Sequence, residues 1–176
     1  MSERYTGRVL RVGVVGCADI AIRRILPALV ELESTELVAV ASRDPAKATA
    51  VAATFGCAGV GGYQNLIDDP GIDALYIPLP PSMHHEWVGR ALRAGKHVLS
   101  EKPLAVNYQQ TEDLVRLARA HDRVLAENYM FLHQVRNTLS AFVAAATSAD
   151  SERPAFDQAL LEQAMLVEQV RAAAAA

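Results

Sequence analysis

A strand, a tight turn and a helix in immediate succession near the start of the chain constrain its fold more than any other feature. Apolar residues 12–15 lead directly into 16–21 (GCADIA), and a helical pattern covers 20–32. In this context a G-x-G-x-x-G-type loop binds the pyrophosphate of a dinucleotide, because bare backbone and a helix N-terminus face the phosphates. Gly16 supplies the turn, but Ala18 replaces the second glycine and Ala21 stands third. An ordinary strand-to-helix turn without a ligand remains the alternative.

Strands and helices alternate through most of the chain. Strands are predicted at 8–15, 37–41, 59–62, 74–77, 97–100 and 123–126, and helices at 20–32, 45–55, 63–67, 82–94 and 108–120. Short connections between such elements favour parallel strands with right-handed crossovers. The pattern therefore predicts an α/β fold in which 1–133 form a doubly wound, six-stranded parallel sheet of the Rossmann type. Residues 134–176 add two C-terminal helices, 135–146 and 156–172, which should pack on this domain.

Three local signals refine the helix boundaries. Pro27 should kink the first helix or give it an irregular start, because proline lacks the backbone N–H of a helix interior. Asp44 should cap the helix that begins at Pro45, and Ser82 should cap the helix that runs to Ala94.

Composition excludes several function classes. The 176 residues are 51% hydrophobic and 21% charged, with a net charge of −3 and no basic block, so nucleic acid is not an expected partner. No apolar stretch approaches the length of a membrane span, and the first residues do not resemble a signal peptide. Cys17 and Cys57 lack metal-ligand spacing. Free thiols in a cytoplasmic protein, with no bound metal, are the expectation.

Four segments should meet at the carboxyl edge of the predicted sheet, where such folds bind ligands. They are Gly16 to Ile20, Ser42-Arg43, Pro78 to His84, and Glu101-Lys102-Pro103. Their convergence is stronger evidence for a site than any one motif.

The cofactor preference depends on Ser42-Arg43, which follow the second strand. An NAD site usually has a carboxylate here for the ribose 2′-OH, and that carboxylate would repel a 2′-phosphate. A hydroxyl and a guanidinium would bind the phosphate, which indicates NADP. The alternative is a solvated arginine beside a serine turn that precedes Asp44.

Lys102 is the candidate catalytic residue. A lysine just past a strand end can donate a proton or hydrogen bond to a carbonyl oxygen during hydride transfer, with Glu101 tuning it electrostatically. A surface ion pair in a turn is the alternative. His84 or His85 could reach a ligand from the next helix, whereas Trp87, His97 and His121 are expected to be structural. Asn128, Tyr129, Met130, Phe131 and His133 lie where substrate contact or plain core packing is possible.

Taken together, GCADIA, the SRD after the second strand, IPLPPSMHHEW, ALRAGKHVLSEKPLA and ENYMFLH resemble the glucose–fructose oxidoreductase and inositol dehydrogenase (Gfo/Idh/MocA) family. The likeness covers 8–133 and is greatest to its NADP-dependent NDP-hexose 3-ketoreductases of deoxysugar biosynthesis. It implies that Lys102 acts near the nicotinamide and the reacting carbon of a keto-sugar nucleotide. It also implies that Gly16, Cys17, Ala18, Asp19 and Ile20 hold the pyrophosphate, that Ser42 and Arg43 hold the 2′-phosphate, and that Leu79, Pro80, His84 and Glu101 surround the nicotinamide ribose. A cis bond before Pro103 is a further expectation.

The sequence departs from this family after His133. Family members continue into an open β-sheet domain that carries the expected Tyr or His proton donor, whereas 134–172 resemble only their last two helices. Two functions follow. The chain is either an NADP-dependent oxidoreductase, slow or inactive for want of the substrate wall, or a non-catalytic NADP-binding module or remnant. A second proton donor would distinguish them, and Tyr108, Tyr129 and His133 are the nearby candidates.

Overall fold

The computed structural model describes residues 8–128, 135–148 and 156–174. Its centre is a six-stranded sheet in the order β3-β2-β1-β4-β5-β6, and all five neighbouring pairs are parallel. The strands are β1 (Leu10–Val15), β2 (Thr35–Ser42), β3 (Ala58–Gly61), β4 (Ala74–Ile77), β5 (His97–Glu101) and β6 (Leu125–Asn128). The predicted doubly wound α/β sheet is confirmed. Its switch point lies between β1 and β4, where the chain reverses its direction across the sheet.

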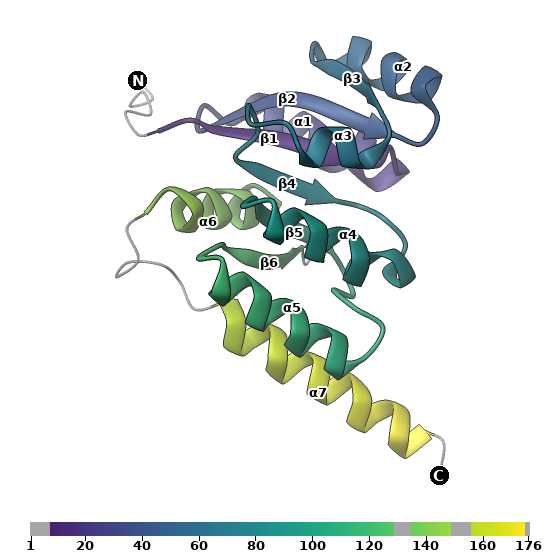
Figure 1. The fold of residues 1–176 in the computed structure, drawn as a ribbon, viewed down its shortest axis with the longest axis vertical. Helices are drawn as coiled ribbons and strands as arrows, with labels where there is room; N and C mark the ends of the chain where they lie inside the picture. Colours follow the sequence, from purple (N-terminus) through teal and green to yellow (C-terminus); the bar gives the residue numbers. More distant parts are fainter. Residues whose placement is uncertain (1–7, 129–134, 149–155, 175–176) are drawn as a thin grey trace.

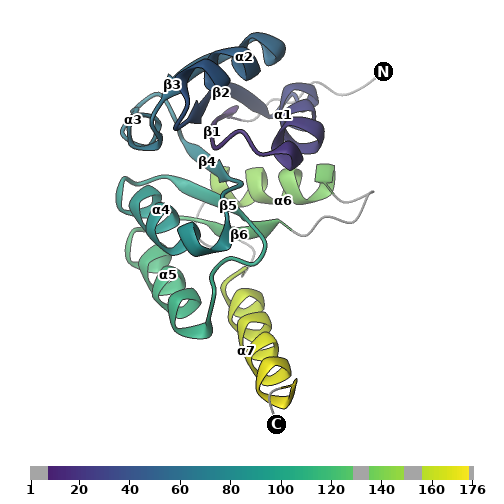
Figure 2. The same cartoon turned by 90° about the vertical axis from the view of Figure 1, so that its right-hand side faces the viewer.

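Helices cover both faces of the sheet (Figures 1 and 2). The first face carries η1 (Ala21–Ile25), α1 (Leu26–Glu31), α2 (Pro45–Phe55) and α6 (Val135–Thr147). The second face carries α3 (Tyr63–Ile67), α4 (Pro81–Arg93) and α5 (Tyr108–Ala120). Helix α7 (Phe156–Ala174) lies beside α5 and extends past the rest of the fold (Figure 1). Each face therefore has its own apolar core, and the sheet separates the two.

The two C-terminal helices reach both cores. Leu139, Phe142 and Val143 of α6 are buried in the core of the first face, and Leu160 of α7 is buried in the core of the second. Arg119 of α5 also donates to Asp157 of α7 at 2.6 Å. Helix α6 thus covers the first face of the sheet between α1 and β6, and α7 continues the helical layer of the second face beyond α5. The expected boundary at residue 133 falls outside the described residues.

The helix starts show where local prediction succeeded and failed. Asp44 caps α2 as predicted, because its Oδ1 accepts from the amides of Ala46 and Lys47. The predicted irregular start is also confirmed, since a π-helical turn, η1, precedes Pro27 in α1. The predicted Ser82 cap is wrong. Helix α4 begins at Pro81, after an extended Pro80, because a proline has the backbone angle that a first helical position requires.

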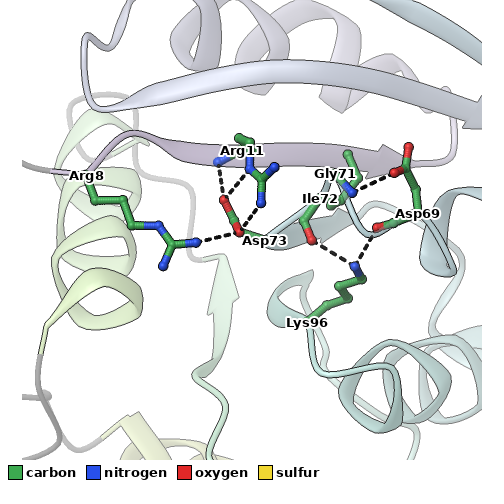
Figure 3. Close-up of polar contacts among 7 residues, drawn as sticks. All are labelled: Arg8, Arg11, Asp69, Gly71, Ile72, Asp73 and Lys96. Carbon is green, nitrogen blue, oxygen red and sulfur yellow. Dashed lines mark hydrogen bonds and ion pairs between the residues drawn. The ribbon is translucent and has the colours of Figure 1, made fainter.

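A polar cluster ties β1, β4 and β5 together at the amino edge of the sheet (Figure 3). Arg11 donates to both carboxylate oxygens of Asp73, at 2.9 and 2.8 Å, and Arg8 adds a second ion pair at 2.9 Å. The Arg11 hydrogen bonds hold the pKa of Asp73 at about 2, against the opposing effect of burial. Lys96 is buried and donates to the carbonyls of Asp69 and Ile72 at 2.6 and 2.8 Å. Burial lowers its pKa.

None of the described helices has the length and apolar character that a membrane span requires.

Candidate functional site

The Gly16 turn connects β1 to η1 at the switch point. Gly16 has a φ of +115° and donates to the Ala41 carbonyl at 2.9 Å. A Cβ at this position would lie 2.9 Å from Cδ2 of Leu79, so both the backbone angle and the close neighbour require glycine. Helical residues begin at Asp19, and the first helical hydrogen bond runs from the Ile22 amide to the Ala18 carbonyl at 3.1 Å. The amides that precede Ile22 at this helix start therefore remain available to an anion.

Ser42 and Arg43 lie at the end of β2, as predicted. Ser42 is 7% exposed, and its Oγ accepts from the Asp44 amide at 3.1 Å, which is the serine turn of the alternative interpretation. Arg43 is exposed, and none of the described carboxylates pairs with its guanidinium. Burial raises the pKa of the Cys17 thiol, and the nearby Lys47 ammonium opposes this shift. The Lys47 ammonium therefore lies near Cys17, the residue that follows Gly16.

The loop after β4 joins the Gly16 turn to the segment after β5. Leu79 is 7% exposed and packs against Gly16, whereas Pro80 is exposed. His84, in the first turn of α4, is fully buried. Its Nε2 lies 2.6 Å from the Leu79 carbonyl and its Nδ1 lies 2.9 Å from the Pro103 carbonyl. In this structure His84 connects two loops, and its contact with a cofactor stays a prediction.

Glu101 and Lys102 differ sharply in their surroundings. Glu101 is 8% exposed, and its Oε1 accepts from Tyr76 Oη at 2.6 Å and from Asn128 Nδ2 at 2.7 Å. Lys102 is exposed, and it precedes a cis peptide bond to Pro103 that confirms the expectation. No described residue pairs with the Lys102 ammonium. A donor free to meet a ligand therefore stands next to a carboxylate fixed inside the protein.

The other candidates have structural surroundings. Nδ1 of His97 accepts from the Val124 amide, and Trp87 packs edge-on against Tyr63 under the Arg90 guanidinium. His85 lies 3.7 Å from Asp113, on the face that α4 turns to α5. Asn128 is the last residue of β6, two residues beyond the predicted strand end, and it is 1% exposed. Tyr129, Met130, Phe131 and His133 lie outside the described residues.

The structure brings the four predicted segments to one edge. They follow β2, β1, β4 and β5, which are consecutive neighbours in the sheet. Sequence reasoning missed Lys47, although its spacing of four from Arg43 across a helix start was a usable signal. It also missed Tyr76, whose position inside an apolar strand gave no such signal. The described ranges contain no cluster of three or more His, Cys, Asp or Glu side chains placed to bind a metal ion.

Known structures match this arrangement. KijD10, a 3-ketoreductase from Actinomadura kijaniata crystallised with NADP and TDP-benzene, superposes with a TM-score of 0.70 at 48% identity, over 76% of this chain and 41% of that one. An NAD-binding oxidoreductase from Klebsiella pneumoniae gives a TM-score of 0.60 at 32% identity, over 68% of this chain and 34% of that one.

Curated relatives match at higher identity. The dTDP-3,4-didehydro-2,6-dideoxy-alpha-D-glucose 3-reductase of Saccharopolyspora spinosa is 57% identical over 128 residues, which is 73% of this chain and 39% of the relative. The enzyme of the same name from Actinomadura kijaniata is 52% identical over 133 residues, 76% of this chain and 40% of the relative. The chain thus spans about two fifths of their length. Residues 10–129 match the model of the oxidoreductase family with an NAD-binding Rossmann fold (GFO_IDH_MocA), and the chain belongs to that family.

Proposed function

We propose that this chain binds NADP(H) and is an oxidoreductase domain of the sugar 3-ketoreductase type, which passes a hydride between NADPH and a keto-sugar nucleotide. The observation that carries the proposal is the convergence of Gly16, Arg43, Leu79 and Lys102 at the switch point of the sheet. Support comes from the 48% identity to a 3-ketoreductase crystallised with NADP.

The residues at this edge fit a dinucleotide that carries a 2′-phosphate. The turn from Gly16 to Ala18 and the helix start that follows it at Asp19 and Ile20 suit a pyrophosphate. Arg43 and Lys47 would hold the 2′-phosphate as cations, and no carboxylate follows β2 until Asp44, which is occupied in capping α2. Leu79 and Pro80 would form the wall beside the nicotinamide ribose. When bound, the cofactor supplies the hydride.

Lys102 would act on the substrate. Reduction of a ketone leaves an alkoxide that must be protonated as it forms, and an ammonium group stabilises that charge and donates the proton. The exposed side chain of Lys102 stands on the rigid end of β5, beside the wall proposed for the nicotinamide ribose. The sugar-binding wall and a second donor belong to the part of the relatives that this chain does not match. We therefore propose that turnover by this chain is slow or absent.

A non-catalytic NADP-binding module or remnant is the second candidate function, because the chain spans only about two fifths of the reductases it matches. We also propose a cytoplasmic location, supported by the two free cysteines, Cys17 and Cys57.

Calorimetric titration tests the cofactor preference. NADPH should bind more tightly than NADH, and Arg43→Ala should weaken NADPH binding by about 1–3 kcal/mol, the loss of a charge-assisted hydrogen bond, while leaving NADH binding nearly unchanged. Arg116→Ala, which removes an exposed arginine on α5, is the matched control and should alter neither cofactor. An equal loss of affinity for both cofactors would show that Arg43 does not bind the 2′-phosphate.

Oxidation of NADPH against a 3-keto-sugar nucleotide tests turnover. Any rate above background should fall about 10²–10⁴-fold in Lys102→Ala, the usual contribution of general acid catalysis, while NADPH affinity stays within a factor of two or so. Lys102→Arg is the matched variant, since it keeps the charge but cannot release a proton. Full activity of Lys102→Ala would exclude Lys102 from the mechanism, and NADPH binding without turnover would favour the binding module.

A further inference from the structure

The backbone around Lys102 is held by side chains at three consecutive residues. The Lys102 amide donates to Glu101 Oε2 at 3.3 Å, and the Leu104 amide donates to Glu127 Oε1 at 2.6 Å. Between them, the Pro103 carbonyl faces Nδ1 of the buried His84. These contacts come from β5, β6 and α4, and none of them uses the Lys102 side chain. The segment is therefore fixed through its backbone while its ammonium remains exposed.

Glu101 is in turn held by two neutral donors from the neighbouring strands. Tyr76 Oη and Asn128 Nδ2 both donate to Oε1, at 2.6 and 2.7 Å, which leaves Oε2 to accept from the Lys102 amide. The strand register explains the grouping. Asn128 pairs with Glu101, and Tyr76 pairs with Leu99, two residues earlier, so the three side chains lie on one face of the sheet.

This arrangement costs stability, which argues for a role beyond folding. Tyr76 and Asn128 are each 1% exposed, and Asn128 Oδ1 is buried without a hydrogen-bond partner among the residues that the structure describes. An unsatisfied buried oxygen and a buried carboxylate are both unfavourable. Turning the amide over would bring Oδ1 against the Glu101 carboxylate, so the observed orientation serves Glu101 and not Asn128. Apolar side chains at positions 101 and 128 would fill the same layer of the core without the buried carboxylate or the unsatisfied oxygen.

We propose that Tyr76 and Asn128 are positioning residues for Lys102, acting through Glu101. By fixing the carboxylate they fix the Lys102 amide, and with it the direction in which the lysine side chain leaves β5. This inference rests on the proposed function, because the orientation of Lys102 matters only if a cofactor and substrate bind beside it.

Affinity labelling with periodate-oxidised NADP tests the proposal without turnover. The 2′-phosphate protects the adenosine ribose from periodate, so both aldehydes form on the nicotinamide ribose. Lys102 forms an imine with an aldehyde and releases water, and cyanoborohydride traps the product for peptide mass spectrometry. The labelling rate is measured at a series of reagent concentrations. The half-saturating concentration then reports affinity, and the maximal rate reports the alignment of Lys102 with the bound reagent.

We expect Tyr76→Phe and Asn128→Leu each to lower the maximal labelling rate of Lys102 about tenfold, because misalignment acts on the bound complex, while the half-saturating concentration changes less than about twofold. Tyr76→Phe should have no further effect in a Glu101→Gln background. Tyr63→Phe removes the hydroxyl of another buried tyrosine, which packs against Trp87, and should leave both parameters unchanged. An unchanged maximal rate in Tyr76→Phe would overturn the proposal.

Amide hydrogen exchange separates this inference from the proposed function. If periodate-oxidised NADP does not label wild-type protein saturably, the NADP proposal fails. The exchange rate of the Lys102 amide in the free protein then decides whether Tyr76 fixes that amide through Glu101. Tyr76→Phe should raise that rate about tenfold by loosening its acceptor, with amides in the middle of α4 unchanged. Unchanged exchange at Lys102 would show that Tyr76 holds nothing in place.

Discussion

Asp73 shows how much one carboxylate can contribute to stability at the amino edge of the sheet. Its pKa of about 2 lies below the ordinary value because Arg11 binds the charged form. A depressed pKa stabilises the fold above the unfolded-state pKa, near 4, and this contribution is lost as the pH falls towards 2. After allowance for screening at the partly exposed arginines, we expect about 1–2 kcal/mol.

Urea unfolding at a series of pH values measures that contribution. Asp73→Asn should lower the free energy of unfolding by a constant amount above about pH 5, and the difference from wild type should shrink towards pH 2. Asp68→Asn, which alters an exposed carboxylate that accepts from Gln64 Nε2 at 2.8 Å, should show little difference at any pH. A difference for Asp73→Asn that persists at pH 2 would mean that it arises from packing and not from charge.

At this same scale, sequence identified most residues of the candidate site but not the directions of their side chains. Ser42, Glu101 and Lys102 were placed at strand ends correctly, because strand ends follow from apolar runs. Whether a side chain there turns inward depends on partners from other strands. Glu101 is buried because Tyr76 and Asn128 lie beside it, and neither neighbour is close in sequence.

Among the described side chains of α7, Leu160 is the most deeply buried. Leu160 is 5% exposed in the core of the second face, whereas Leu166 on the same helix is 59% exposed. Leu160→Ala should therefore lower the free energy of unfolding by about 2–4 kcal/mol, and Leu166→Ala by less than about 0.5 kcal/mol. Chemical denaturation of the two variants makes the comparison with the same substitution on the same helix. Equal, small effects would show that α7 is not docked in solution.

The first turns of two helices, α1 and α4, were difficult to predict because each contains a proline. A proline inside a pattern signals a break, and the π-helical turn before α1 is the form that the break takes. At α4, two consecutive prolines outweighed the capping signal of Ser82, because Pro81 is already suited to the first helical position.

For the whole molecule, the doubly wound parallel sheet followed from the regular alternation of strands and helices, since short connections favour right-handed crossovers. The convergence of four segments followed from the shared direction of the strands, whereas the order of the strands was not predicted. The reach of α6 and α7 along the two layers could not be derived in the same way, because an amphipathic helix indicates that it packs but not on which face.

The polar side chains at the two edges of the sheet differ in what they contact. At the amino edge Arg11 binds the Asp73 carboxylate and Lys96 binds backbone carbonyls, so substitutions there alter only how firmly the strands are held. At the carboxyl edge the side chains of Arg43 and Lys102 are exposed, and the buried Glu101 accepts from the Lys102 amide. Exposed residues at the carboxyl edge can therefore be substituted with little loss of stability, because the contacts that hold the strands lie at the amino edge. Such a sheet can change its carboxyl-edge side chains during evolution while the fold is kept.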